Sequence, residues 1–151
     1  INLINSANGY ITLFSSAGVG CYGFKLNGFD CIATNELLDV RLSVQKANHK
    51  CKYETGYIGG DITSEETHAK LFNEIEMWKE KEDLQQVDVV FATPPCQGMS
   101  TAGKLDENDI RNVLFQHAVD PFWIYPKYFM FETVPAFMPP TIKNGDEEDI
   151  D

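Results

Sequence analysis

The stretch YITLFSSAGVG, residues 10–20, passes from an apolar run into a turn made of small residues. Residues 10–14 predict a short buried strand, and a helix over about 21–26 is expected to follow, ending at Asn27-Gly28. Small residues are needed where a backbone opens a helix and must approach a ligand closely. A turn of this kind occurs in many α/β proteins, and this one lacks the GxGxxG spacing of dinucleotide-binding proteins.

The same alternation of strand and helix continues along the chain. Further strands are predicted at 29–35, just before Gly60-Asp61, at 87–93 and at Tyr128–Phe131. A helix is also predicted over 110–119. This alternation predicts an α/β fold: a Rossmann-like parallel sheet of about five strands joined by right-handed crossover helices.

Two of the expected helices have recognisable start signals. Asp39 is expected to cap a helix that ends near Asn48, and Thr63 with Glu66 fits the capping box of a longer helix. The expected apolar faces are Val40, Val44 and Ala47 on the first helix, and Leu71, Phe72, Ile75 and Trp78 on the second.

Ligands bind beyond the carboxyl ends of the strands in an open parallel sheet. The segments that follow the predicted strand ends should therefore converge on one edge: residues 15–20, Glu36, Asp61, residues 94–100 and Glu132. Glu36 stands where a ribose-binding carboxylate belongs, or it is a surface acid at a helix start. Asp61 can accept a hydrogen bond from an adenine amino group, or it can cap its own turn.

Length and charge limit the possible classes of protein. The 151 residues suggest one domain over 1–138 and an acidic, disordered tail over 139–151. The net charge is −11, and five acids in the last six residues account for nearly half of it, leaving about −6 elsewhere. This excess of negative charge is unsuited to a chain that binds nucleic acid without a partner, because phosphate binding needs a basic surface.

Cysteine spacing and hydropathy suggest a reduced, cytoplasmic setting. The four cysteines form no CxxC pair, so a metal site is not predicted. No apolar run approaches the length of a membrane span, and the N-terminus does not resemble a signal peptide. The chain begins with Ile, from which we expect residues to be missing upstream.

Cys96 is the residue whose position most strongly predicts chemistry. An apolar strand runs into Pro94-Pro95, which end it and stiffen the backbone that presents this cysteine. A thiolate is a strong nucleophile, whereas a buried strand-end thiol would not need the flanking PPCQG. Glu132 ends the neighbouring predicted strand and is a candidate proton donor.

These segments together resemble the cytosine-C5 DNA methyltransferase family. PPCQG, followed by Ser100, resembles the catalytic motif of that family, and LFSSAG (13–18) resembles its first motif. Glu36, Gly60-Asp61, the segment RNVLF (111–115) and ETV (132–134) match later motifs in the same order. The agreement extends over about residues 11–137.

The resemblance implies a reaction and a set of roles. Cys96 would attack C6 of a cytosine flipped out of the duplex, Glu132 would protonate N3, and C5 would take the methyl group of S-adenosylmethionine. The implied cofactor-binding residues are Phe14, Ser16, Ala17, Gly18, Glu36, Leu37, Asp61, Ile62, Pro94, Asn112 and Leu114. The implied substrate-binding residues are Pro95, Gln97, Gly98 and Ser100. No metal is implied, and a restriction-modification system is the expected setting.

The sequence departs from the family pattern in four motif positions and in extent. Ser16 and Val19 replace usual glycines, Thr12 stands where an acid is common, and Thr133 replaces an asparagine that braces the catalytic loop. The family's QxRxR motif, target-recognition domain and final helix are absent from these 151 residues. We therefore expect a fragment or half enzyme that is weak or inactive alone and meets DNA through a missing C-terminal region or a second subunit.

Other functions remain open at this point. One is a non-catalytic S-adenosylmethionine-binding module that works through a partner chain. Another is a tRNA cytosine-C5 methyltransferase that uses the same motifs. A nicotinamide-dependent Rossmann enzyme is disfavoured by the incomplete glycine pattern and by PPCQG.

Overall fold

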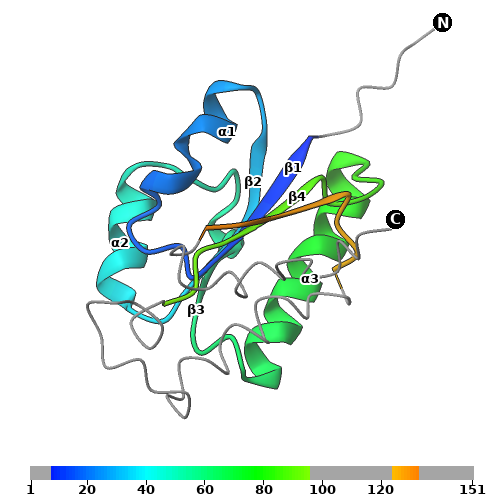
Figure 1. The fold of residues 1–151 in the computed structure, drawn as a ribbon. Helices are drawn as coiled ribbons and strands as arrows, with labels where there is room; N and C mark the ends of the chain where they lie inside the picture. Colours follow the sequence, from blue (N-terminus) through cyan, green and yellow to red (C-terminus); the bar gives the residue numbers. More distant parts are fainter. Residues whose placement is uncertain (1–7, 96–123, 133–151) are drawn as a thin grey trace, which may run out of the picture.

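The computed structural model describes residues 8–95 and 124–132, which build a five-stranded parallel sheet (Figure 1). The strands are β1 (Gly9–Leu13), β2 (Asp30–Glu36), β3 (Tyr57–Gly59), β4 (Val89–Ala92) and β5 (Tyr128–Phe131). Their order across the sheet is β3-β2-β1-β4-β5. The predicted Rossmann-like parallel sheet is confirmed, and each strand lies within a few residues of its predicted range.

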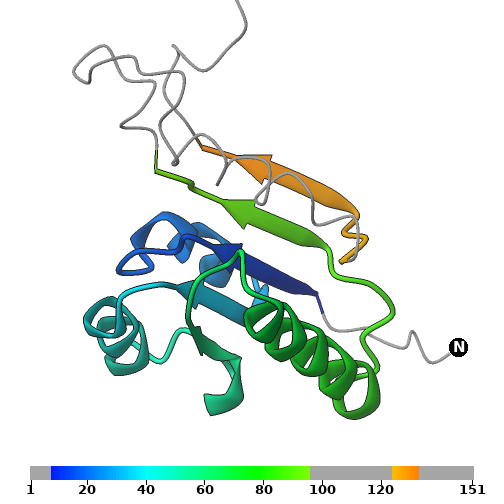
Figure 2. The ribbon, with the colours of Figure 1, turned by 90° about the horizontal axis from the view of Figure 1, so that it is seen from below.

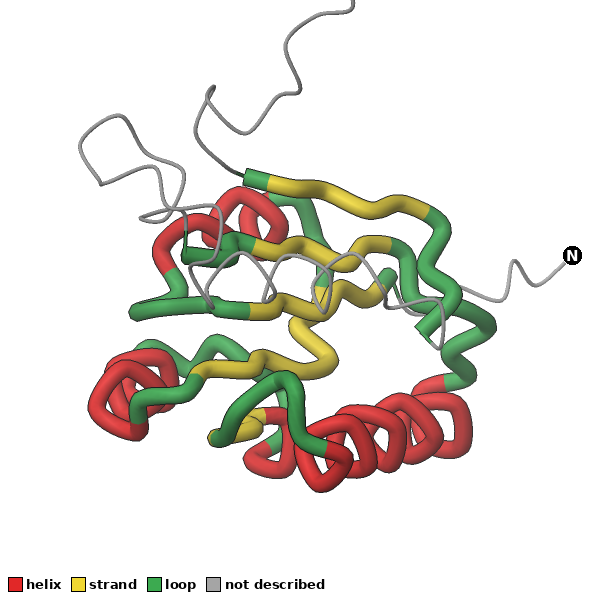
Figure 3. The backbone as a smooth tube through the Cα atoms, turned by 60° about the horizontal axis from the view of Figure 1, so that its bottom comes forward, coloured by secondary structure: helices red, strands yellow, loops and turns green. Residues whose placement is uncertain are grey.

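Helices cover both faces of this sheet (Figure 1). The helical segments are η1 (Val19–Cys21), α1 (Tyr22–Leu26), α2 (Asp39–Ala47), η2 (Glu54–Gly56) and α3 (Glu65–Glu82). α1 and α2 lie on one side, and α3 lies on the other. Because every strand pairing is parallel, the strand arrows in Figure 2 point one way, and the loops that follow the strands gather at one edge (Figure 3).

The larger apolar core lies between the sheet and α3. Leu71, Ile75 and Trp78 of α3 are almost fully buried there against β1, β2 and β4. The prediction that Phe72 shares this face is wrong, because Phe72 is 50% exposed. A position one residue after Leu71 is turned about 100° around the helix axis, away from the sheet.

The start signals of α2 and α3 were assigned one residue away from their true positions. Leu38, in extended backbone, is the N-cap of α2, and Asp39 is its first helical residue. Ser64 is the N-cap of α3, where its hydroxyl accepts from the N–H of Thr67 at 3.2 Å. The predicted capping box is therefore wrong, and Glu66 instead forms an ion pair with Lys70.

The predicted apolar face of α2 is also wrong. Val40 and Val44 are 69% and 42% exposed, and the buried residues of the helix are Leu42 and Gln45. Gln45 is fully buried because its amide forms hydrogen bonds with side chains and backbone beneath the turn that follows β1. Polar contacts, more than apolar spacing, therefore set the rotation of α2.

Adjacent residues of α3 provide a paired test of the core. We expect Leu71→Ala to lower the free energy of unfolding by about 2–5 kcal/mol, because it removes a fully buried side chain and leaves a cavity. Phe72→Ala, half exposed, is the matched control and should cost less than about 1 kcal/mol. Urea unfolding followed by tryptophan fluorescence measures both, and equal losses would contradict the assigned helix face.

Candidate functional site

The candidate site lies where the sheet order changes direction. β2 and β3 lie on one side of β1, and β4 and β5 lie on the other, so the loops after β1 and β4 diverge from one point. A cavity of about 200 Å³ opens there. Its lining residues are Ser15, Ser16, Ala17, Val19, Gly20, Cys21, Phe91, Thr93 and Glu132. The structure thus brings Glu132 to the first turn, although more than 100 residues separate them in the sequence.

The turn after β1 has an unusual backbone. Phe14, Ser16 and Gly18 have φ of 55°, 50° and 87°, in the left-handed region. Only Gly18 is a glycine, and a Cβ at this position would come within 3.0 Å of the Cγ of Gln45. A non-glycine residue held in this region costs about 1–3 kcal/mol, so neighbouring contacts must hold Phe14 and Ser16.

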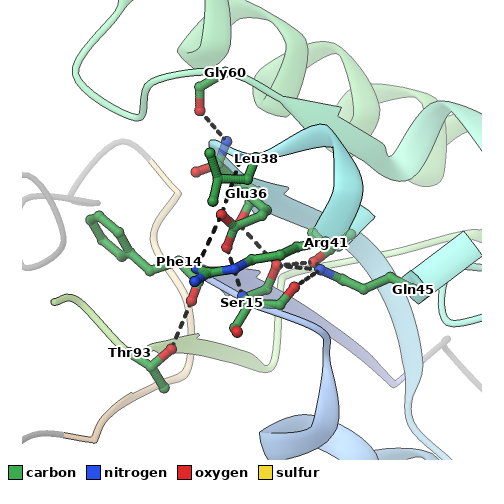
Figure 4. Close-up of polar contacts among 11 residues, drawn as sticks. Phe14, Ser15, Glu36, Leu38, Arg41, Gln45, Gly60 and Thr93 are labelled. Carbon is green, nitrogen blue, oxygen red and sulfur yellow. Dashed lines mark hydrogen bonds and ion pairs between the residues drawn. The ribbon is translucent and has the colours of Figure 1, made fainter. Parts of the chain in front are cut away.

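Hydrogen bonds tie Phe14 and Ser16 to the ends of two neighbouring strands. Figure 4 shows the contacts around Phe14 and Glu36. The carbonyl of Phe14 accepts from the Thr93 hydroxyl at 2.9 Å, at the end of β4. The N–H of Ser15 donates to the Asn35 carbonyl at 3.0 Å, and that of Ser16 donates to Glu36 Oε2 at 2.8 Å. The turn is therefore held from both of its sides.

Glu36 ends β2 as a buried carboxylate, only 4% exposed. Its Oε1 accepts from the N–H of Leu38 at 3.1 Å and lies 3.6 Å from Nη1 of Arg41. The alternative of a surface acid is wrong. The ribose-binding role stays a prediction, and two of the carboxylate's roughly four acceptor positions already accept hydrogen bonds from the protein. Leu37, beside it, is 63% exposed at the same edge.

A buried polar network lies beneath the turn. Gln45 Nε2 donates to Ser15 Oγ at 2.9 Å and to the Ser16 carbonyl at 2.6 Å, and Gln45 Oε1 lies 2.7 Å from the Thr34 hydroxyl. Lys50 Nζ reaches the Thr12 and Thr34 hydroxyls at 2.9 and 3.2 Å. Gln45 and Lys50 are not among the site residues predicted from the sequence. The available signal for Gln45 was its position three residues after Leu42, on the same helix face.

Asp61 and Ile62 occupy the turn between β3 and α3. Asp61 Oδ1 accepts from both the N–H and the hydroxyl of Thr63, at 2.9 Å each, which is the turn-capping role left open above. Ile62 is buried in the core beneath α3. Asn35 Nδ2 donates to the Gly60 carbonyl at 3.1 Å, so the end of β2 also positions this turn. Cofactor contacts by Asp61 and Ile62 stay predictions.

The end of β4 lies beside Glu132. Ala92 pairs with Phe131, and the N–H of Glu132 donates to the Ala92 carbonyl at 3.1 Å. Pro94 is buried and Pro95 is partly buried just after this strand. The other predicted site residues lie outside the described residues: Cys96, Gln97, Gly98, Ser100, Asn112 and Leu114. The expected helix over 110–119 and the expected tail over 139–151 also lie outside.

The three described cysteines belong to the core. Cys21, Cys31 and Cys51 are free thiols and are buried on the α1 side of the sheet with Tyr10. Burial raises the pKa of the Cys21 thiol, which favours the neutral form. Within residues 8–95 and 124–132, no group of three or more His, Cys, Asp or Glu side chains is arranged to hold a metal ion. None of the helices in these ranges is long and apolar enough to cross a membrane.

Comparison with known proteins identifies the family. The model of the C-5 cytosine-specific DNA methylase family matches residues 9–145. The chain belongs to this family. It is 36% identical over 137 residues to type II methyltransferase M1.HgaI of Avibacterium volantium, covering 85% of the chain and 35% of that protein. M.XorII of Xanthomonas oryzae is 33% identical over 126 residues, covering 82% of the chain and 27% of that protein.

A third relative has the same extent of match. Type II methyltransferase M1.HphI of Haemophilus parahaemolyticus is 34% identical over 134 residues, covering 83% of the chain and 32% of that protein. The chain thus spans about a third of the length of the curated relatives that it matches. The resemblance drawn from the motifs is confirmed at the level of the family.

Two serines with different backbone conformations test the strain in the turn. Ser16→Gly should raise the free energy of unfolding by about 0.5–1 kcal/mol, because glycine adopts the positive φ without a Cβ penalty. Ser43→Gly, on the exposed side of α2, should lower it by a similar amount. Thermal or urea unfolding of the two variants gives the comparison, and a loss of stability in Ser16→Gly would show that the turn is not strained there.

Proposed function

We propose that this chain is the catalytic part of a DNA cytosine-C5 methyltransferase that takes its methyl group from S-adenosylmethionine and acts in a restriction-modification system. The observation that carries the proposal is the cavity in which the strained turn meets Glu132 and the end of β4. Family membership indicates the reaction class, and the relatives that the chain matches are named type II methyltransferases.

The described residues fit one part of a methyl-donor site. Small-molecule pockets usually have volumes of about 300–1,000 Å³, so a cavity of about 200 Å³ corresponds to part of such a site. The cavity is lined by Ser15, Ser16 and Ala17, whose small side chains let a ligand approach the backbone. Leu37 is exposed at the neighbouring strand end, and Glu36 retains about two acceptor positions for hydroxyl groups.

Cys96 and Glu132 carry the proposed chemistry. The Cys96 thiolate adds to C6 of the flipped cytosine while Glu132 donates its proton to N3, so that C5 becomes nucleophilic. S-adenosylmethionine supplies the methyl group to C5 as an electrophile. Loss of the C5 proton to a base then expels the Cys96 thiolate, and the proton on N3 returns to Glu132.

The backbone supports this pairing of roles. In the sequence, Cys96 comes four residues after Ala92. The Ala92 carbonyl accepts a hydrogen bond from the N–H of Glu132. Pro94 and Pro95 limit the conformations of the intervening segment, because each has a fixed φ. Glu132 and the segment 93–95 that leads to Cys96 therefore follow neighbouring strands at the same edge of the sheet.

We propose that DNA binding depends on a second region or subunit. The net charge of −11 is unsuited to a phosphate backbone, and the relatives are about three times as long as the region matched. The chain alone should therefore bind DNA weakly.

Mechanism-based trapping tests the function directly. The chain is incubated with labelled S-adenosylmethionine and a duplex that contains 5-fluorocytosine, alone and with a chain that supplies the DNA-reading half of the family fold. Because fluorine at C5 blocks the final elimination, we expect a denaturation-resistant adduct that carries the label. Cys96→Ser should abolish the adduct, and Glu132→Gln should slow its formation about 10²–10⁴-fold.

The controls separate the alternatives. Glu65→Gln, on the exposed first turn of α3, should leave adduct formation unchanged, and an unmodified cytosine duplex should give turnover without an adduct. Donor binding without an adduct under any condition would favour the non-catalytic module. A 5-fluorocytidine tRNA substrate that reacts in place of DNA would reassign the substrate. Absence of donor binding would overturn the proposal.

A further inference from the structure

The peptide unit on each side of Ser16 is fixed by a different side chain. The N–H of Ser16 donates to Glu36 Oε2 at 2.8 Å, and its carbonyl accepts from Gln45 Nε2 at 2.6 Å. Glu36 belongs to β2, whereas Gln45 is a fully buried residue of α2. Gln45 does not line the cavity beside Glu132, which is the space proposed for the methyl donor. With Gly18 and Lys50 it lines a second cavity of about 280 Å³.

The hydrogen bonds fix the orientation of the Gln45 amide. The Ser16 carbonyl can only accept, so the Gln45 amide must present its NH₂ group to the turn and its oxygen to Thr34. Ser15 Oγ already receives a hydrogen from Gln45 Nε2 and donates its own to the Asn35 carbonyl. The Thr34 hydroxyl has one hydrogen and lies 2.7 Å from both Gln45 Oε1 and Ser15 Oγ, so these two oxygens share it. Gln45 Oε1 can only accept, and its contact with Thr34 depends on that hydrogen.

Lys50 is a donor to this hydrogen-bond network. Its ammonium group can only donate, and it donates to the hydroxyls of Thr12 and Thr34. No carboxylate in the described part of the chain forms an ion pair with Lys50. The positive charge polarises the Thr34 hydroxyl, which strengthens its bond to Gln45 Oε1 and, through the amide, the bond to Ser16.

We propose that Gln45 is a positioning residue for the methyl-donor turn, with Lys50 and Thr34 fixing the orientation of its amide. Gln45 holds Ser16 in its left-handed conformation from behind, and its Cγ packs against Gly18, the next left-handed position of the turn. This role rests on the proposed function, because it concerns how the chain presents its backbone to the donor. It adds a second anchor, from α2, to the one that Glu36 supplies from β2.

Gln45→Glu is the decisive variant. The side chain keeps its shape, still accepts from Thr34 and gains attraction to Lys50, so the fold is retained. A carboxylate cannot donate to Ser16 or Ser15, and it repels the Ser16 carbonyl. We expect amide hydrogen exchange in residues 15–18 to accelerate at least tenfold in the chain without ligand, while exchange in α3 stays unchanged.

The second measurement is binding of S-adenosylhomocysteine by titration calorimetry, for which we expect about tenfold weaker affinity in Gln45→Glu. Lys50→Met should produce a smaller change of the same sign, because Thr34 still donates to Gln45. Glu74→Gln is the matched control, because Glu74 is also buried, lies on α3 and accepts from Trp78 Nε1 outside the turn network. Both readouts should stay at wild-type values in this variant.

The two measurements separate this proposal from the function on which it rests. Unchanged exchange in residues 15–18 of Gln45→Glu, with the fold intact, would overturn the positioning role whatever the chain binds. Faster exchange together with an unchanged affinity would show that the network holds the turn but does not serve the donor, which also overturns it. If the wild-type chain binds no S-adenosylhomocysteine while exchange responds as expected, the proposed function fails instead.

Discussion

The hydrogen bond from the Ser16 N–H to the Glu36 carboxylate is the interaction on which the site depends. It joins a turn in left-handed backbone to the end of the neighbouring strand at 2.8 Å. A hydrogen bond to a charged group contributes about 1.5–3 kcal/mol, which is comparable to the cost of about 1–3 kcal/mol for holding Ser16 at positive φ. The same carboxylate accepts from the N–H of Leu38, the N-cap of α2. One buried group therefore ends β2, begins α2 and fixes the turn.

Most of the fold follows from local sequence signals. The strand at Tyr128–Phe131 has its predicted bounds. The spacing of Leu71, Phe72, Ile75 and Trp78 predicts α3, although Phe72 does not share the buried face. These signals are strong because burial against the sheet selects apolar side chains with the period of the element. The cap of α3 was misplaced by one residue, since Thr63 and Ser64 have the same capping chemistry and only the backbone of the folded turn distinguishes them.

The rotation of α2 shows where periodicity fails. Val40 and Val44 gave the stronger apolar pattern, yet the helix buries Gln45 in their place. A buried glutamine is stable only when its donors and acceptor are matched, and here the partners are Ser15, Ser16 and Thr34, 11 to 30 residues away in the sequence. No local pattern contains that match. The candidate site was thus predictable where it follows strand ends, and unpredictable where buried polar side chains from distant elements complete it.

The first turn and Glu132 are joined through hydrogen bonds at the end of β4. Thr93 donates from its N–H to the Leu13 carbonyl and from its hydroxyl to the Phe14 carbonyl, which joins the end of β4 to the first turn. The Glu132 N–H then bonds the carbonyl of Ala92, the residue before Thr93. A shift of the turn must therefore disturb the strand end that precedes Pro94, and that strand end positions Glu132. Under the function that we propose, these bonds within the sheet fix Glu132 relative to the turn that would face the methyl donor.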